Sequence, residues 1–145
     1  MIAHYQLHGL LHACQTFAVN TDDGECSLLE VIQNEAKILQ QLRMSPVELS
    51  VLLPLLVAYP YHCSYEIIYT TFRKKELTEK NIEQSRIYLE AARLSDIWDI
   101  EIRPSRAAVS RARLKLRSFH IEVISVMSKG YLLIPSENSL KPVSY

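Results

Sequence analysis

The clearest helical pattern in the chain lies between residues 27 and 42. Ser27 and Glu30 have the Ser-x-x-Glu spacing of a capping box, in which two side chains satisfy backbone N–H groups at the start of a helix. Apolar residues then recur every three or four positions and would share one helix face: Leu28, Ile32, Ala36, Leu39 and Leu42. This face is expected to pack either on the domain core or on the same helix of a second subunit. We expect a homodimer in which Leu28, Ile32 and Leu39 meet the partner.

Residues 1–20 fit both helix and strand. Leu7, Leu10 and Leu11 suit a helix, whereas residues 16–19 suit a strand, and the polar cluster that follows them predicts a turn. His4, His8 and His12 are spaced so that a helix would align them as metal ligands. Zinc sites usually add cysteine or carboxylate ligands close by, so we predict no metal site here. Residues 1–43 are expected to form an N-terminal extension.

A second helix start follows at Ser45. This residue is placed as an N-cap, Pro46 takes the first helical position and Glu48 completes another capping box. The apolar run that follows predicts a helix to about residue 58, in which Pro54 should cause a kink or remove one backbone hydrogen bond. Ser64 then opens a shorter helix, expected over residues 67–72.

The segment from residue 76 to residue 102 predicts a helix followed by an extended strand. Thr78 is placed to cap a helix that ends near Leu94, and its packing face consists of Ile82, Leu89 and Ala92. Trp98, Ile100 and Ile102 then alternate with acidic residues, a pattern typical of a strand, and Pro104 predicts a break. Trp98 is the only tryptophan in the chain, and tryptophan is favoured in interface hot spots. It is therefore a candidate partner-binding residue; the alternative is that it seals the domain core.

A helix expected over residues 105–117 combines an apolar stripe with a dense set of cations. Val109, Ala112 and Leu116 share one side of this helix, and another side carries Arg106, Ser110, Arg113 and Arg117. No Asp or Glu lies between Arg103 and Arg117, and guanidinium groups suit both phosphates and guanine edges. The stretch is a candidate DNA recognition helix; an ordinary solvated basic face is the alternative.

Two β-rich runs, residues 121–126 and 131–134, predict a C-terminal hairpin, and residues 135–145 read as a loose polar tail. The expected fold class is therefore α+β. The chain has 145 residues, of which 48% are hydrophobic and 22% charged, as expected for one globular domain with an appendage. The net charge is zero, but the charges are unevenly distributed along the chain. Lys37 and Arg43 are the only Lys or Arg before residue 73, so the first half is acidic and the second half is basic. The basic second half could steer the molecule toward nucleic acid.

No catalytic or cofactor motif competes with this interpretation. The 3 glycines form no phosphate-binding loop, and the 3 cysteines form no Cys-x-x-Cys pair. His62 and Cys63 would point to opposite faces of a strand, so we do not expect an active thiol. The sequence has no run that is long and apolar enough for a membrane span and no signal peptide. We expect a cytoplasmic protein that is not an enzyme and needs no cofactor or metal.

Three stretches carry motifs of a known family. They are Met44-Ser-Pro-Val-Glu-Leu-Ser-Val-Leu-Leu, Val109-Ser-Arg-Ala-Arg-Leu-Lys-Leu and Ile121-Glu-Val-Ile-Ser-Val-Met-Ser-Lys-Gly-Tyr-Leu. In order, they resemble the entry to the first helix, the recognition helix and the wing of the DNA-binding effector domain of OmpR/PhoB-type response regulators. The segment His62-Cys-Ser-Tyr-Glu-Ile-Ile resembles a further part of that domain. The resemblance implies a winged helix-turn-helix over residues 44–134 that binds double-stranded DNA as a sequence-specific transcriptional regulator.

Carried across by position, the resemblance implies groove, phosphate or wing contacts for Arg103, Arg106, Ala107, Ser110, Arg111, Arg113 and Lys129. To these we add Lys115 and Arg117, two further cations of the same helix. The chain also departs from the family: Met127 replaces the wing arginine, the residues before Met44 are too few for a receiver domain, and the helix expected at 27–42 would replace at least part of a small N-terminal sheet. The segment before the recognition helix is longer by roughly twenty residues, a length that normally has its own structure. The alternative function is a winged helix that binds protein, such as RNA polymerase or another regulator.

Overall fold

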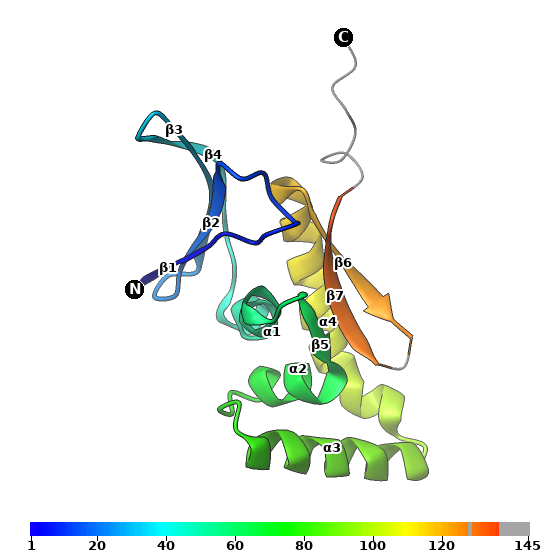
Figure 1. Cartoon of the computed structure of the whole chain (residues 1–145). Coiled ribbons are helices and arrows are strands. Elements are labelled where there is room, and N and C mark those ends of the chain that lie inside the picture. The colour runs from blue at the N-terminus through cyan, green and yellow to red at the C-terminus, as the bar shows by residue number, and fades with distance from the viewer. Residues whose placement is uncertain (128, 137–145) are drawn as a thin grey trace.

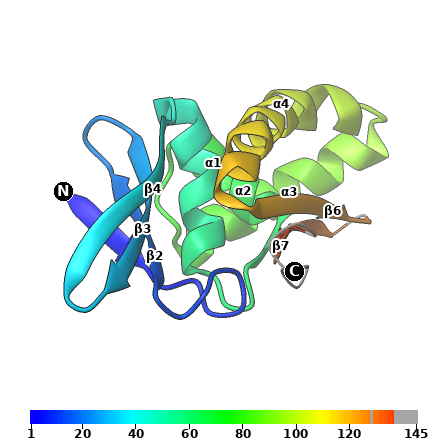
Figure 2. The same ribbon diagram turned by 90° about the horizontal axis from the view of Figure 1, so that it is seen from above.

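The computed structural model describes residues 1–127 and 129–136, which form an α+β fold with antiparallel sheets on two sides of a group of helices (Figure 1). The strands are β1 (Ile2–Tyr5), β2 (Gln15–Asn20), β3 (Glu25–Ile32), β4 (Glu35–Arg43), β5 (His62–Ser64), β6 (Ile121–Val126) and β7 (Gly130–Pro135). The helices are α1 (Pro46–Val57), α2 (Tyr65–Phe72), α3 (Glu79–Leu94) and α4 (Trp98–Leu116), with a short 3-10 turn at Arg117–Phe119. Seen from above, α1 lies between the N-terminal sheet and α4 (Figure 2).

The first four strands form one sheet in the order β1-β2-β3-β4, so the helix predicted over residues 27–42 is wrong. Gln33 and Asn34 have φ angles of 54° and 66° and form a two-residue hairpin turn between Ile32 and Glu35. Pairing of Leu28 with Phe17 of β2 buries Leu28 in the core. Residues with ordinary helix propensity thus adopt strand structure because long-range pairing outweighs the local signal. A four-stranded sheet thus stands where the sequence predicted that a helix replaces at least part of a sheet.

The correction also changes the proposed dimer contact. Leu28 is buried within its own chain, so it is not available to a second subunit. Ile32 and Leu39 are exposed, at 55% and 41%, but they lie on neighbouring strands of the hairpin instead of one helix face. Leu39 is the extra residue of a bulge in β4, since Leu28 pairs with Gln40 and Leu29 with Ile38. A bulge in an edge strand hinders strand-to-strand pairing between copies, so a dimer through this hairpin would use side chains.

The segment before this hairpin also forms strands. The strand expected at residues 16–19 is confirmed as part of β2. His4 lies in β1, and His8 and His12 lie in the connection to β2, so the three histidines do not share a helix face. The four-residue spacing of these histidines therefore does not align their side chains on one side of a helix.

Local signals predicted α1 correctly. The Ser45 side chain accepts a hydrogen bond from the Glu48 backbone N–H at 3.2 Å, and the Glu48 carboxylate accepts one from the Ser45 N–H at 2.8 Å. Pro54 lies inside this helix, as expected, and α1 ends at Val57. The next helix, α2, begins at Tyr65, two residues before the predicted start. Both helices are where the cap signals placed them, within the usual error of a helix boundary.

The predicted helix after Thr78 is confirmed as α3, because the Thr78 hydroxyl accepts a hydrogen bond from the Asn81 N–H at 3.1 Å. The strand predicted from Trp98 to Ile102 and the break at Pro104 are wrong, since α4 runs through both. Ile102 is buried with Tyr69 and Leu89, whereas Ile100 is 61% exposed. Burial of Ile102 against α2 and α3 thus selects a helix over the alternating local pattern. Pro104 has no N–H to donate to the Ile100 carbonyl oxygen, so one helix hydrogen bond is lost. Because Ile100 is an exposed residue, this loss costs the fold little stability.

Residues from both ends of the sequence build the main core. The rings of Phe17 in β2 and Phe119 after α4 meet edge to face, with centroids 5.1 Å apart. Leu52 and Leu55 of α1 and Leu116 of α4 belong to the same buried cluster. Residues 1–43 therefore pack as part of this core.

The predicted C-terminal hairpin is confirmed as β6 and β7, and β5 completes a sheet in the order β5-β7-β6. Gly130 pairs with Ser64 at a point where an added Cβ would lie 2.0 Å from the Cys63 carbonyl oxygen, so the close approach of the strands requires glycine. Residues 137–145 of the predicted tail lie outside the described residues. Within the described part of the chain, no helix combines the length and the apolar character needed to cross a bilayer.

Candidate nucleic-acid interface

The two sides of α4 have opposite characters from Arg103 to its end. Buried small and apolar side chains fix this helix against α1 and the hairpin: Ser105, Ala108, Val109, Ala112 and Leu116. The opposite side is exposed and carries four of the predicted site residues, Arg103, Ala107, Ser110 and Arg111. The buried side that the helical wheel predicted, Val109, Ala112 and Leu116, is therefore confirmed. Of the predicted basic side, Arg106 and Ser110 are exposed, whereas Arg113 and Arg117 pair with an acid of β6. Leu114, 62% exposed on the exposed side of α4, is an apolar neighbour that the charge argument did not include.

Arg103 and Arg111 are the least neutralised of the predicted cations on α4. In the part of the chain that the structure describes, neither of them forms an ion pair. Arg106 lies 3.8 Å from Asp99, one turn or more back on α4, and both side chains are at least half exposed. An ion pair of this kind is worth about 0–1 kcal/mol and can exchange easily for another anion. These three arginines are available to a phosphate.

Arg113 and Arg117 are held by one acid of the hairpin. The Nε of Arg113 donates to Glu122 of β6 at 2.8 Å, and the Nε of Arg117 donates to the same carboxylate at 3.1 Å. Partial burial works to raise the pKa of Glu122, but the hydrogen bonds and charges of the two arginines outweigh burial and lower it. Both cations therefore attach the hairpin to α4. Their positive charge is partly neutralised by Glu122.

Lys115 is partly exposed, and its ammonium group contacts α1 and the residue at the end of β4. Its Nζ donates to the Glu48 carboxylate at 2.7 Å and to the Arg43 carbonyl oxygen at 2.9 Å. Burial works to raise the pKa of Glu48, but the Lys115 ammonium and the Ser45 cap outweigh burial and lower it. We therefore leave Lys115 out of the interface, because its charge neutralises a buried carboxylate.

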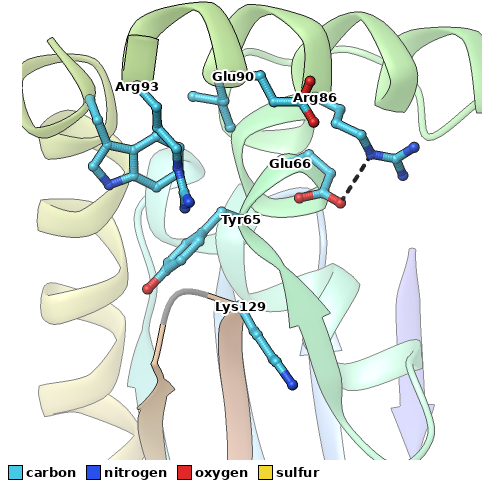
Figure 3. A pocket seen from close by; sticks show the side chains of 8 residues that line it. Tyr65, Glu66, Arg86, Glu90, Arg93 and Lys129 are labelled. Carbon is cyan, nitrogen blue, oxygen red and sulfur yellow. Dashed lines mark ion pairs between the residues drawn. The ribbon is translucent and has the colours of Figure 1, made fainter. Parts of the chain in front are cut away.

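Trp98 and Lys129, predicted to have separate roles, line one cavity of about 270 Å³ between α2, α3, the start of α4 and the hairpin (Figure 3). The Trp98 ring meets the Tyr65 ring edge to face at 5.5 Å, and the Arg93 guanidinium lies 4.0 Å from the Trp98 ring centroid. Figure 3 shows Arg86 reaching toward Glu66, and the two groups are 3.6 Å apart. Trp98 is half-buried in these contacts, which favours the packing role over the partner-binding role.

Residues considered for chemistry lie in unreactive surroundings. Cys63 is buried in β5, and burial raises the pKa of its thiol to about 11, which disfavours the thiolate that a nucleophile needs. His62, its neighbour in the strand, is exposed. Among residues 1–127 and 129–136, no group of three or more His, Cys, Asp or Glu side chains could hold a metal ion. The exposed face of α4 is thus the best candidate site in the described structure.

The sequence alone did not reveal which acidic residues neutralise the cations of α4. No acid lies in the sequence from Arg103 to Arg117, but Glu48 and Glu122 reach that stretch from α1 and β6. Their effect divides the predicted cations into an available group and an internally paired group. Comparison of the chain with family models, with curated proteins and with solved structures gave no match.

Proposed function

We propose that this chain is a sequence-specific DNA-binding transcriptional regulator that uses α4 as a recognition helix in a winged-helix arrangement. The motif resemblance to OmpR/PhoB-type effector domains, the order α1, α2, α4 and hairpin, and the sheet before α1 all support this proposal. The hairpin β6–β7 would serve as the wing, with Lys129 near its turn. The protein would act in the cytoplasm, and as a homodimer if paired half-sites supply the affinity that one module lacks.

One observation carries the proposal: Arg103 and Arg111 lie on the same exposed side of α4 with small residues between them. At about 1.5 Å per residue, the two positions are about 12 Å apart along the helix axis. Ala107 and Ser110 lie between them, and both are exposed. Small side chains let a helix approach base edges closely while the flanking arginines reach phosphates or guanines, in a groove about 12 Å wide. Solvation of a basic face alone would not explain why small side chains lie between the two arginines.

Binding to selected DNA tests the proposal. Duplexes recovered from a random pool by the full chain should share a motif, and Arg111→Ala should weaken binding to that motif more than to unrelated DNA. Lys37→Ala is the matched control, because it removes an exposed cation from the distant β4 strand. Recovery of no common motif, together with equal binding by Arg111→Ala and the wild type, would reject base recognition by α4.

A second function has its own support on another surface. Ile87 and Leu94 are 58% and 90% exposed and, seven residues apart, share one side of α3, and Ile100 at the start of α4 is 61% exposed. Large exposed apolar side chains that cluster on one surface often mark a protein-binding site. Under this alternative the domain binds RNA polymerase or another regulator through α3 and the start of α4. Binding of a partner that Leu94→Asp abolishes, without any salt-dependent DNA binding by the wild type, would favour the alternative.

A further inference from the structure

The cation run at the end of α2, Arg73-Lys74-Lys75, has no role in the proposed interface. The side chains of Arg73 and Lys75 line a surface pocket of about 190 Å³ between α2 and α3, and the other lining residues are Asn81, Gln84, Ser85 and Tyr88. No carboxylate is among these lining residues. Within the described part of the chain, neither Arg73 nor Lys75 forms an ion pair. The pocket is therefore a concave surface with two available positive charges.

The hydrogen-bond pattern decides which neutral groups of the pocket can donate to a ligand. The Thr70 hydroxyl donates to the Glu66 carbonyl oxygen at 2.6 Å, so the Ser85 hydroxyl donates its own proton to Thr70, 2.7 Å away. Interaction of the Tyr88 phenol with the Glu101 carboxylate raises the pKa of Tyr88. Ser85 therefore has no proton left for a ligand, and Tyr88 forms an aromatic wall of the pocket, stacked on Tyr69.

The remaining donors come from two helices and converge on the pocket. Asn81 uses one amide proton on the Glu76 carbonyl oxygen at 2.9 Å, which leaves the second for a ligand. Gln84 lies one turn further along α3 and adds another amide. Arg73 lies over the Tyr69 ring at 5.5 Å, and that ring stacks on Tyr88, which limits where the guanidinium can point. Two cations and two amides without a carboxylate suit a compact oxyanion.

We propose that this pocket binds a phosphoryl group through Arg73, Lys75, Asn81 and Gln84. Cations at the end of α2 could instead serve only to stabilise the helix through its dipole. That explanation accounts for the cations but not for the amides of α3 beside them. The phosphoryl group belongs either to a free phosphorylated molecule or to the backbone of a bound duplex, and the same side chains recognise both.

Phosphate binding to the full chain tests the site without reference to α4. Inorganic phosphate, and pyrophosphate more strongly, should raise the melting temperature of the wild type in a saturable way at constant ionic strength. Lys75→Ala and Arg73→Ala should each lower this phosphate affinity by about tenfold, the loss expected for one charge-assisted hydrogen bond. Lys74→Ala is the matched control, because Lys74 is the exposed neighbour that does not line the pocket.

A second arm separates the two sources of the phosphoryl group. If the ligand is a DNA phosphate, the double variant Arg73→Ala, Lys75→Ala should flatten the dependence of duplex affinity on salt by about two contacts, whereas a free ligand leaves it unchanged. Either result supports the site when phosphate binds as expected. Absence of saturable phosphate binding to the wild type overturns the proposal. It is also overturned if Lys74→Ala lowers the phosphate affinity as much as Arg73→Ala and Lys75→Ala do. Failure of DNA binding by α4 would leave the phosphate arm intact, so the two proposals fail separately.

Discussion

Lys115 of α4 donates a hydrogen bond to the buried carboxylate of Glu48 in α1, at 2.7 Å. The same carboxylate caps α1 by accepting from the Ser45 N–H. One buried acid therefore orients α1 and α4 relative to each other and neutralises a cation that the sequence had assigned to DNA.

Removing the cation of this pair should destabilise the fold. Lys115→Met leaves a carboxylate buried without its partner, and we expect a loss of about 2 kcal/mol in the free energy of unfolding, less than for a fully buried pair because Lys115 is partly exposed. Chemical denaturation at neutral pH measures this loss. Arg111→Met is the control on the exposed side of α4 and should leave the free energy of unfolding nearly unchanged.

The same pair predicts how the destabilisation depends on pH. Folding lowers the Glu48 pKa, so its contribution to stability is complete above the ordinary glutamate pKa and is lost as the pH falls through the lower value in the folded state. The stability difference between the wild type and Lys115→Met should therefore shrink in acid. A difference that stays constant from neutral pH to below the ordinary pKa would contradict the assignment.

Glu122 gives a test in which an affinity should increase. Glu122→Gln removes the anion that holds Arg113 and Arg117, so both cations become available to phosphates, and we expect duplex affinity to rise several-fold with a steeper salt dependence. Glu35→Gln, an exposed acid of β4, is the control for the change in net charge. Unchanged affinity and salt dependence in a Glu122→Gln variant that keeps its melting temperature would mean that the paired arginines take no part in the interface.

Trp98→Ala distinguishes packing from partner binding. Trp98 contacts Tyr65 and Arg93 and is half-buried, so truncation should cost about 2 kcal/mol of stability, below the range for a fully buried tryptophan. Thermal denaturation provides the measurement. An unchanged melting temperature with loss of transcriptional effect would restore Trp98 as a partner-binding residue.

The homodimer stays a prediction, now placed on the β3–β4 hairpin. Ile32→Asp together with Leu39→Asp should give a folded monomer if side chains of this hairpin meet a second copy. Sedimentation over a range of concentrations measures the assembly state. A wild type that sediments as a monomer at every concentration would end this prediction.

The elements that the sequence predicted correctly are those with signals inside a few residues. Ser45 and Glu48 cap α1, Thr78 caps α3, and turn residues separate β6 from β7, so each of these signals is complete without the rest of the chain. Ser27 and Glu30 gave an equally good local signal and failed, because Leu28 gains more by pairing with Phe17 of β2. Ile102 likewise joined α4 through contacts with α2 and α3.

In the candidate site, too, local patterns were predictable from the sequence and long-range contacts were not. Helical periodicity alone predicts the buried side of α4, which contains Val109, Ala112 and Leu116. Periodicity also placed Arg106, Ser110, Arg113 and Arg117 on the outer side, whereas Arg103, Ala107 and Arg111 were assigned only from the family resemblance. Which cations are neutralised depends on Glu48, 67 residues away from Lys115, and on Glu122 of the hairpin. Periodicity cannot give such pairings, and they separate the cations available to DNA from those that stabilise the fold.

The salt dependence of duplex binding tests the central claim most directly. Arg103→Ala with Arg111→Ala should lower the slope of log affinity against log salt by about two, since each arginine that meets a phosphate releases about one counterion. Fluorescence anisotropy of one labelled duplex, measured at several salt concentrations for the double variant, for Lys37→Ala and for the wild type, gives the slopes. A shallower slope for the double variant, with the wild-type slope kept by Lys37→Ala, is the predicted result. A wild type that does not bind, or a double variant with the wild-type slope, would contradict DNA binding through α4.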